Sequence, residues 1–257
     1  MTLPEIHQLL PRQSPQPLDD DAVRALYAAR DRRLPVVRAN FVASIDGAAT
    51  VGNLSGPLGG AADKRVFDLL RQLSDVIVVG AGTLRTEKYD AMRLSAGASQ
   101  WRLAQGLSAQ PHFAIVSARL DLDASSEVFV NAPVRPLVLT ADTADPEARR
   151  RLAPVADVIS CGELRAGGRG IVEALTSRGL MQLHCEGGPH LLGTLIADDM
   201  LDELCLTTSP LLEGGRGPRI AAGEMDAVSR SMSLDHVLIS ADVLFTKYSR
   251  IREDAPR

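Results

Sequence analysis

The sequence predicts one α/β domain built on a mixed, mostly parallel sheet. Short aliphatic runs alternate along the chain with helix-like segments, which is the pattern of parallel strands joined by crossover helices. The run at residues 76–79 is continuously aliphatic, as in a strand buried on both faces. Near the C-terminus, two strand-like runs follow each other with no long helix between them, which predicts an antiparallel end to the sheet.

The composition is that of a globular protein, and it argues against several other classes. Hydrophobic residues make up 45% of the 257 residues, which is enough to bury a sizeable core. The net charge of −4 leaves no basic surplus for binding nucleic acid. No run approaches the roughly 18 apolar residues of a membrane span, and the N-terminus lacks the pattern of a signal peptide.

The cysteines indicate the compartment. Cys161, Cys185 and Cys205 are widely spaced and form no CxxC pair, so they suggest neither a disulfide framework nor a zinc site. We therefore expect a reducing, cytoplasmic setting and no bound metal.

The elements before residue 80 follow from local patterns. Residues 1–18 are proline-rich and expected to be irregular, whereas acids at the start and an arginine at the end favour a helix over residues 19–30. Residues 36–45 predict a strand that an Asp-Gly turn ends. Apolar side chains at i, i+3, i+4 and i+7 predict a helix over residues 62–73.

The remainder of the chain repeats the same alternation. The expected strands are residues 113–116, 137–139, 155–159, 181–185, 203–208 and 241–248, and the expected helices are residues 146–152, 170–178 and 191–197. We divide the chain into an N-terminal extension with a short helix, residues 1–35, and a single domain, residues 36–257, with no second domain ahead of it.

The first motif is VVGAGT, where a buried strand runs into glycines. Ligands of open α/β sheets bind at the carboxyl ends of strands, and Gly80 and Gly82 would let backbone approach a phosphate or a ring. Thr83 adds a hydroxyl. A tight turn with a threonine cap explains the stretch equally well. It is not a GxGxxG fingerprint, because no third glycine follows and the residues after Thr83 are polar and give no helical core.

The second motif is CEGGPHLLG, at the junction of a strand and a helix. Pro189 suits the first helical turn, and Gly187 and Gly188 leave the helix N-terminus bare, which favours an anion. Glu186, at the end of the strand, would point a carboxylate into the same crevice. Alternatively, Glu186 is an ordinary N-terminal acid that interacts with the helix dipole.

The third motif is NFVASIDG, with Asn40, Ser44 and Asp46 alternating along a strand and its turn. Such a polar row is unusual on a buried strand, although Asp-Gly is most often a plain turn. Nucleophile-elbow, P-loop and zinc-deaminase signatures are absent. Of the scattered histidines, His184 lies beside the second motif and is more simply a core residue than a catalytic base.

Four blocks in order resemble one known family. NFVASIDG, DVIVVGAGTLR, EGGPHLLG and LDELCLTTSPLLEGG together resemble the reductase domain of bacterial riboflavin biosynthesis, the C-terminal domain of the bifunctional deaminase-reductase. The resemblance implies a dihydrofolate-reductase-like, three-layer α/β/α fold. It also implies a homodimer that uses NADPH to reduce the ribosyl group of 5-amino-6-(5-phosphoribosylamino)uracil to ribityl, by hydride transfer from C4 of the nicotinamide to C1′ of the sugar.

The resemblance also implies roles for individual positions. Glu186 and Asp46 would be the catalytic residues, with Glu186 as substrate clamp and proton relay and Asp46 shaping the adjacent turn. Substrate-binding positions would be Asn40, Ser55, Arg71, Arg93 and Glu186. Cofactor-binding positions would be Val42, Gly80, Gly82, Thr83, Glu87, Ser117, Arg119, Gly187, Gly188, Pro189, His190, Leu191, Leu192, Gly193 and Thr194, with Ser117 and Arg119 assigned to the 2′-phosphate of NADPH.

The chain departs from the family pattern in two ways. It carries no zinc-deaminase motif, so we expect a reductase alone. It also has Ala48 after the SxDG turn, where family members often carry Lys or Arg. The missing cation leaves open an NADPH-dependent dihydrofolate or pterin reductase on the same scaffold. A nucleotide-binding module without catalysis is a further alternative, which no feature of the sequence favours.

Overall fold

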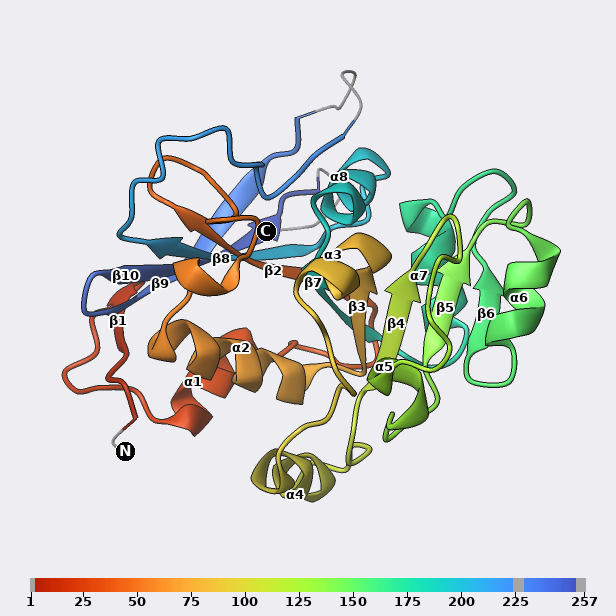
Figure 1. Ribbon diagram of the computed structural model, residues 1–257. Coiled ribbons are helices and arrows are strands. Elements are labelled where there is room, and N and C mark those ends of the chain that lie inside the picture. Colours follow the sequence, from red (N-terminus) through yellow and green to blue (C-terminus); the bar gives the residue numbers. More distant parts are fainter. Residues whose placement is uncertain (1–2, 224–228, 253–257) are drawn as a thin grey trace.

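A ten-stranded sheet runs through the whole molecule (Figure 1). The computed structural model describes residues 3–223 and 229–252. The strands are β1 (His7–Leu10), β2 (Val36–Ser44), β3 (Val76–Gly80), β4 (His112–Val116), β5 (Leu137–Thr140), β6 (Asp157–Ser160), β7 (Gln182–Gly187), β8 (Glu203–Ser209), β9 (Met232–Ser240) and β10 (Val243–Arg250). Their spatial order is β1-β9-β10-β8-β2-β7-β3-β4-β5-β6.

The predicted mixed sheet is confirmed. All neighbouring pairs from β8 to β6 are parallel, whereas β8, β10, β9 and β1 pair in antiparallel fashion. The parallel part follows the alternation of strands and crossover helices that the aliphatic runs predicted. The antiparallel part lies where two strands were expected without a helix between them.

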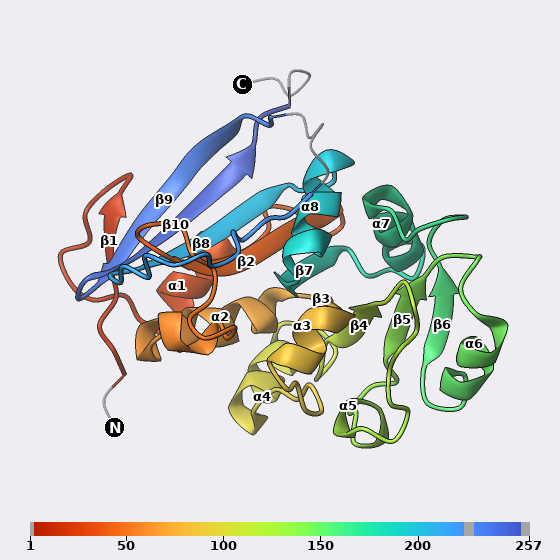
Figure 2. The same cartoon turned by 45° about the horizontal axis from the view of Figure 1, so that its top comes forward.

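Helices cover the two faces of the sheet and complete the three-layer, dihydrofolate-reductase-like fold (Figures 1 and 2). The helices are α1 (Asp20–Tyr27), α2 (Ala61–Leu73), α3 (Ala81–Thr86), α4 (Ala96–Ala104), α5 (Glu127–Val130), α6 (Pro146–Leu152), α7 (Gly168–Thr176) and α8 (Pro189–Ala197), with a short 3₁₀ turn at Gly56–Leu58. The apolar sides of α7 and α8 pack on one face of β2, β7, β3 and β5. Helices α3, α5 and α6 pack on the opposite face of β3, β4 and β5, and α1 and α2 pack on β8, β9 and β10.

Several elements were not predicted. β1 lies within residues that were expected to be irregular, and it pairs with β9, which was also missed. α3 begins directly after Gly80. Its residues show no helical pattern of apolar side chains, because only Ala81 and Leu84 of the six are buried. α4 and α5 were missed as well; α4 buries little apolar surface and α5 is only four residues long.

Residues ahead of β2 join the same core as the rest of the chain. Arg65 on α2 is nearly buried and donates to the Asp20 carboxylate, to the Pro4 carbonyl and to the Leu18 carbonyl. This one guanidinium therefore fixes the N-terminal extension against α2.

Buried ion pairs connect β2, β8 and β10. Arg38 on β2 donates through Nε to Glu203 Oε2 on β8 at 2.6 Å, and Lys247 Nζ on β10 lies 2.7 Å from Glu203 Oε1. The three side chains are 7%, 13% and 8% exposed. Because an unpaired charge at this depth would be costly, the network fixes β8 and β10 beside β2. Within the described ranges, no helix is long and apolar enough to cross a bilayer.

Candidate active site

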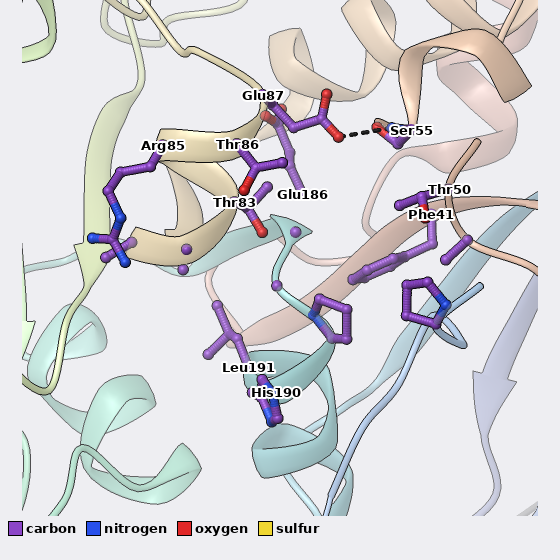
Figure 3. Close-up of a pocket in the computed structure, with 18 of the residues that line it drawn as sticks. Phe41, Thr50, Ser55, Thr83, Arg85, Thr86, Glu87, Glu186, His190 and Leu191 are labelled. Atoms are coloured by element: carbon purple, nitrogen blue, oxygen red, sulfur yellow. Dashed lines mark hydrogen bonds between the residues drawn. The ribbon is translucent and has the colours of Figure 1, made fainter. Parts of the chain in front are cut away.

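A cleft of about 1250 Å³ opens at the carboxyl ends of β2, β3 and β7 (Figure 3). This is the edge at which open α/β sheets bind ligands. One side of the cleft consists of the turns that follow β3, β4 and β7, and the other consists of β2 and the first turn of α2. Most of the positions predicted from the sequence lie on this cleft, and they come from segments more than 100 residues apart.

Two glycine turns meet in the cleft. A Cβ on Gly80 would lie 3.6 Å from the Gly188 Cα, and a Cβ on Gly187 would lie 2.7 Å from the Thr83 Cγ2. Gly188 also has φ +102°, a conformation that residues with a side chain rarely adopt. Glycine is therefore favoured at positions 187 and 188, and the turns after β3 and β7 lie side by side with bare backbone towards the cleft.

The second turn leads into an uncapped helix. Gly188 is the N-cap of α8 and Pro189 is its first residue, so no side chain satisfies the backbone N–H groups of the first turn. His190, Leu191 and Thr194 line the cleft beside them. The positive end of the helix dipole therefore faces the cleft, as at a phosphate site.

Two predicted positions of α8 do not reach the cleft. Leu192 is fully buried in the core. Gly193 packs so tightly against the carbonyl of Ala222 that a Cβ would lie 2.0 Å from its oxygen. Leu192 and Gly193 therefore serve the packing of α8 and do not line the cleft.

Arginines lie at the β4 end of the cleft. Arg119 is exposed and lines the cleft together with Ser117, as the sequence predicted. Arg85 on α3 lines it too and donates to the Asp121 carbonyl at 3.0 Å. Arg85 was missed because α3 was missed; a helix starting at Gly80 would have placed it beside the cleft.

Glu186 forms a buried ion pair with Arg71. The expectation that its carboxylate points into the cleft is therefore wrong. Arg71 Nε lies 2.5 Å from Oε1 and Nη2 lies 2.6 Å from Oε2. The Glu186 side chain is 0% exposed, so only its backbone reaches the cleft. Because side chains alternate along a strand, Glu186 shares the α2-facing side of β7 with His184, and Arg71 on α2 meets it there.

Aromatic and imidazole groups enclose this ion pair. The Tyr89 hydroxyl donates to Glu186 Oε2 at 3.2 Å, and burial, with the Glu186 charge, raises the pKa of Tyr89 well above its usual value. Burial acts against the charge of Arg71, but Glu186 more than offsets it and raises the pKa of Arg71. His184 is also buried, and this burial, with the charges of Arg38 and Arg71, lowers its pKa well below the usual range, so it is neutral.

The β2 side of the cleft carries further predicted residues. Asn40 and Val42 line it from β2. Glu87, the C-cap of α3, accepts the backbone N–H of Ser55 at 2.8 Å, which closes the cleft between α3 and the loop before α2 (Figure 3). Phe41, which the sequence did not single out, also lines this wall.

Two predicted residues lie away from the cleft. Arg93 is exposed, and its Nη2 donates to the Asn131 carbonyl at 3.0 Å. Asp46 is also exposed and holds the turn after β2 by accepting from the Ser44 hydroxyl and from the Gly214 N–H. These contacts match the predicted turn-shaping role of Asp46 but place neither residue in the cleft.

Two charged residues of α2 line the cleft and were not identified from the sequence. They are Asp63 and Lys64, which the helical pattern simply assigned to polar faces. Asp63 Oδ1 accepts from the Thr207 hydroxyl on β8 at 2.7 Å. Burial raises the pKa of Asp63, and the hydrogen bond from Thr207 partly opposes that rise.

Comparison with known proteins identifies the family. The sequence matches the family described as RibD C-terminal domain over residues 35–245. The chain belongs to the RibD C-terminal domain family. The resemblance to riboflavin-biosynthesis reductases is therefore confirmed.

Individual members of this family bear out the match. A protein of Archaeoglobus fulgidus named 2,5-diamino-6-ribosylamino-4(3H)-pyrimidinone 5′-phosphate reductase is 30% identical over 74% of this chain and 87% of its own length. A protein of the same name from Methanothermobacter thermautotrophicus is 26% identical over 72% and 82%. A pyrimidine reductase-like protein of Corynebacterium diphtheriae superposes with a TM-score of 0.81 at 28% identity, covering 90% of this chain and 99% of that one.

Two further features of the described structure concern position 48 and metal binding. Ala48 is buried, and a Cβ on Gly217 would lie 2.9 Å from its Cβ, so position 48 contributes no side chain to the cleft. Within residues 3–223 and 229–252, no group of three His, Cys, Asp or Glu side chains gathers as a metal site would require.

The turn held by Asp46 gives a pH-dependent prediction. The Ser44 hydroxyl, followed by the Gly214 and Glu213 N–H groups, lowers the pKa of Asp46 from 3.8 to about 2. A lowered folded-state pKa stabilises the fold above the unfolded value and loses this effect as the pH falls through the folded value. Asp46→Asn should therefore lower the Tm at pH 5, and the difference from wild type should disappear towards pH 2. An equal difference at both pH values would contradict this role.

Proposed function

We propose that the chain is an NADPH-dependent oxidoreductase that reduces the ribosyl group of a 5-amino-6-(5-phosphoribosylamino)pyrimidine to a ribityl chain. The observation that carries the proposal is the two-sided cleft of a RibD C-terminal domain family member. One side has an uncapped helix end and two glycine turns, which suit a dinucleotide. The other has a polar wall on β2 and α2, which suits a pyrimidine.

The protein residues position the two reactants. When bound, the nicotinamide would supply a hydride to C1′ of the opened sugar, and the attached nitrogen would take a proton from water. The N–H groups at the start of α8 would hold the pyrophosphate, while Gly80 and Gly188 would let the cofactor lie against bare backbone. Because Arg71 holds the Glu186 carboxylate, we give Glu186 a positioning role rather than that of proton relay. Asp46 acts through its turn.

The arginines at the β4 end of the cleft support NADPH over NADH. Arg119 and Arg85 line this end of the cleft and supply guanidinium groups that suit a 2′-phosphate, and Ser117 lines the cleft there as well. On the substrate side, position 48 provides no cation, and Lys64, which lines the cleft from α2, is paired with Asp68. We assign Ser55 to the substrate phosphate.

The pyrimidine itself has two candidate forms. The family resemblance implies a uracil ring, with a carbonyl at C2. The names of the archaeal relatives specify a 2,5-diamino-4(3H)-pyrimidinone ring, with an amino group at C2. Both carry the same ribosylamino phosphate.

A second candidate function is NADPH-dependent reduction of dihydrofolate or another pterin. The observation that favours it is the buried Ala48, which removes a cation that would otherwise meet a sugar phosphate. It predicts faster turnover of dihydrofolate than of either pyrimidine.

One experiment separates these functions. Oxidation of NADPH and NADH is followed at the nicotinamide absorbance band with each pyrimidine and with dihydrofolate. We expect NADPH oxidation with a ribosylaminopyrimidine phosphate. Arg119→Ser should raise the KM for NADPH about tenfold while leaving that for NADH unchanged, and Arg150→Ser on α6, also exposed but outside the cleft, serves as the control. Absence of NADPH oxidation with every substrate would refute the reductase.

We further propose that the protein is a cytoplasmic homodimer. The three cysteines are free and buried, as suits a reducing compartment. Strands β8, β9 and β10 pack on α1 and α2 with one face. Apart from Leu204 on β8, which packs against the core below α8, no helix covers their other face in the described part of the chain (Figure 2). That open face carries Leu206, Leu234, Ile239 and Leu244. Leu234 is 42% and Leu244 36% exposed, and a second copy would cover them.

The dimer is tested by light scattering at micromolar concentration. Wild type should have twice the chain mass, and Leu244→Glu should be monomeric because it places a charge in the apolar contact. Leu103→Glu, on the exposed side of α4, is the matched control and should remain dimeric. A monomeric wild type would exclude this assembly.

A further inference from the structure

Asp63 is a carboxylate of the cleft with one unused oxygen. Oδ1 accepts from the Thr207 hydroxyl at 2.7 Å. Oδ2 accepts no hydrogen bond within the described residues. A Cβ on Gly59 would lie 2.7 Å from Oδ2, so the glycine leaves room for the carboxylate at the cleft wall. The side chain therefore has one oxygen free to accept a hydrogen bond from a ligand in the cleft.

No cation neutralises this carboxylate in the part of the chain that the structure describes. Lys64 is adjacent on α2 but forms its ion pair with Asp68, one turn further along and on the exposed side. A partly buried acid without a counter-charge is unfavourable unless it receives hydrogen bonds. Thr207 supplies one donor, and a ligand with N–H groups would supply the rest.

The place of Asp63 in the fold shows which end of a ligand it meets. The glycine turns follow β3 and β7, whereas Asp63 is bonded to β8, and the strand order is β8-β2-β7-β3. With neighbouring strands about 4.8 Å apart, β8 lies roughly 10 Å from β7. Asp63 therefore lies on the side of the cleft away from the cofactor turns, and a substrate whose C1′ lies against the cofactor would direct the far edge of its ring to this side.

The two candidate pyrimidines differ at that remote end. A 2-amino-4(3H)-pyrimidinone presents two neighbouring donors, the 2-amino group and N3–H, which match the two oxygens of a carboxylate. The uracil form presents N3–H between two carbonyls, so a carboxylate would meet a carbonyl oxygen. The two-donor edge of the uracil, N1–H with the 6-amino N–H, adjoins the sugar and would have to lie near the cofactor instead.

We propose that Asp63 is the specificity-determining residue of the substrate ring, and that its carboxylate holds the 2-amino and N3–H groups of a 2,5-diamino-6-ribosylamino-4(3H)-pyrimidinone phosphate. The proposal rests on the reductase function above and selects between its two candidate rings. Thr207 acts as a positioning residue that orients the carboxylate. Because pterins carry the same two-donor edge, Asp63 accepts their ring as well.

The test is equilibrium binding, measured by calorimetry with NADP⁺ present, of the 2,5-diamino pyrimidinone phosphate and of its uracil counterpart. Wild type should bind the diamino form at least about tenfold more tightly, since the wrong ring leaves buried polar groups unpaired. Asp63→Asn, which keeps the shape and the Thr207 hydrogen bond, should reduce this preference to about twofold or less. Asp68→Asn, on the same helix but outside the cleft, should leave it unchanged.

The outcomes separate this proposal from the reductase function. Equal or tighter binding of the uracil form by wild type, or an equal loss of both ligands in Asp63→Asn, would overturn the role of Asp63. Preferential turnover of the uracil form with NADPH would overturn it while leaving the reductase intact. A preference for the diamino ring without any turnover would support Asp63 and overturn the reductase, and binding of neither ring would overturn both.

Discussion

The close packing of two backbone turns is the constraint on which the rest of the site depends. The turns after β3 and β7 meet where Gly187 has no side chain to clash with Thr83, and Gly188 takes a positive φ that residues with a side chain rarely adopt and that leads the chain into α8. This contact brings the N-terminus of α8 to the carboxyl edge of the sheet. A side chain at position 188 would strain this turn, and one at position 187 would displace Thr83.

Charged side chains lie on both sides of the cleft and in the buried layer between β7 and α2. In that layer Arg71 and Glu186 neutralise each other, so the pair holds β7 against α2 and does not attract a charged ligand. Arg85 and Arg119 offer guanidinium groups on the cofactor side, where Glu87 and Asp121 also line the cleft, whereas Asp63 offers a carboxylate at the far end of the substrate side. The arginines suit a dinucleotide phosphate, and Asp63 suits a ring with N–H donors. Because these groups lie at opposite ends of the cleft, they can orient the two reactants before reaction.

The sequence predicted what depends on local pattern. The spacing of apolar residues placed α2, and the run of Gly187 and Gly188 before a proline placed the uncapped start of α8. It could not predict contacts that the fold alone creates: Glu186 meets Arg71 across 115 positions. Asp63 faces the cleft only because α2 crosses the sheet near β8. The amphipathic pattern assigns such a residue to solvent.

The affinity of the chain for NADPH tests the central claim most directly. Binding would be measured by nicotinamide fluorescence in wild type, in Gly188→Ala and in Gly179→Ala. Gly179 also has positive φ but lies in a turn outside the cleft, so it is a control for backbone strain alone. We predict that Gly188→Ala binds NADPH at least about tenfold more weakly, whereas Gly179→Ala binds as wild type does. Unchanged affinity in Gly188→Ala would contradict the account.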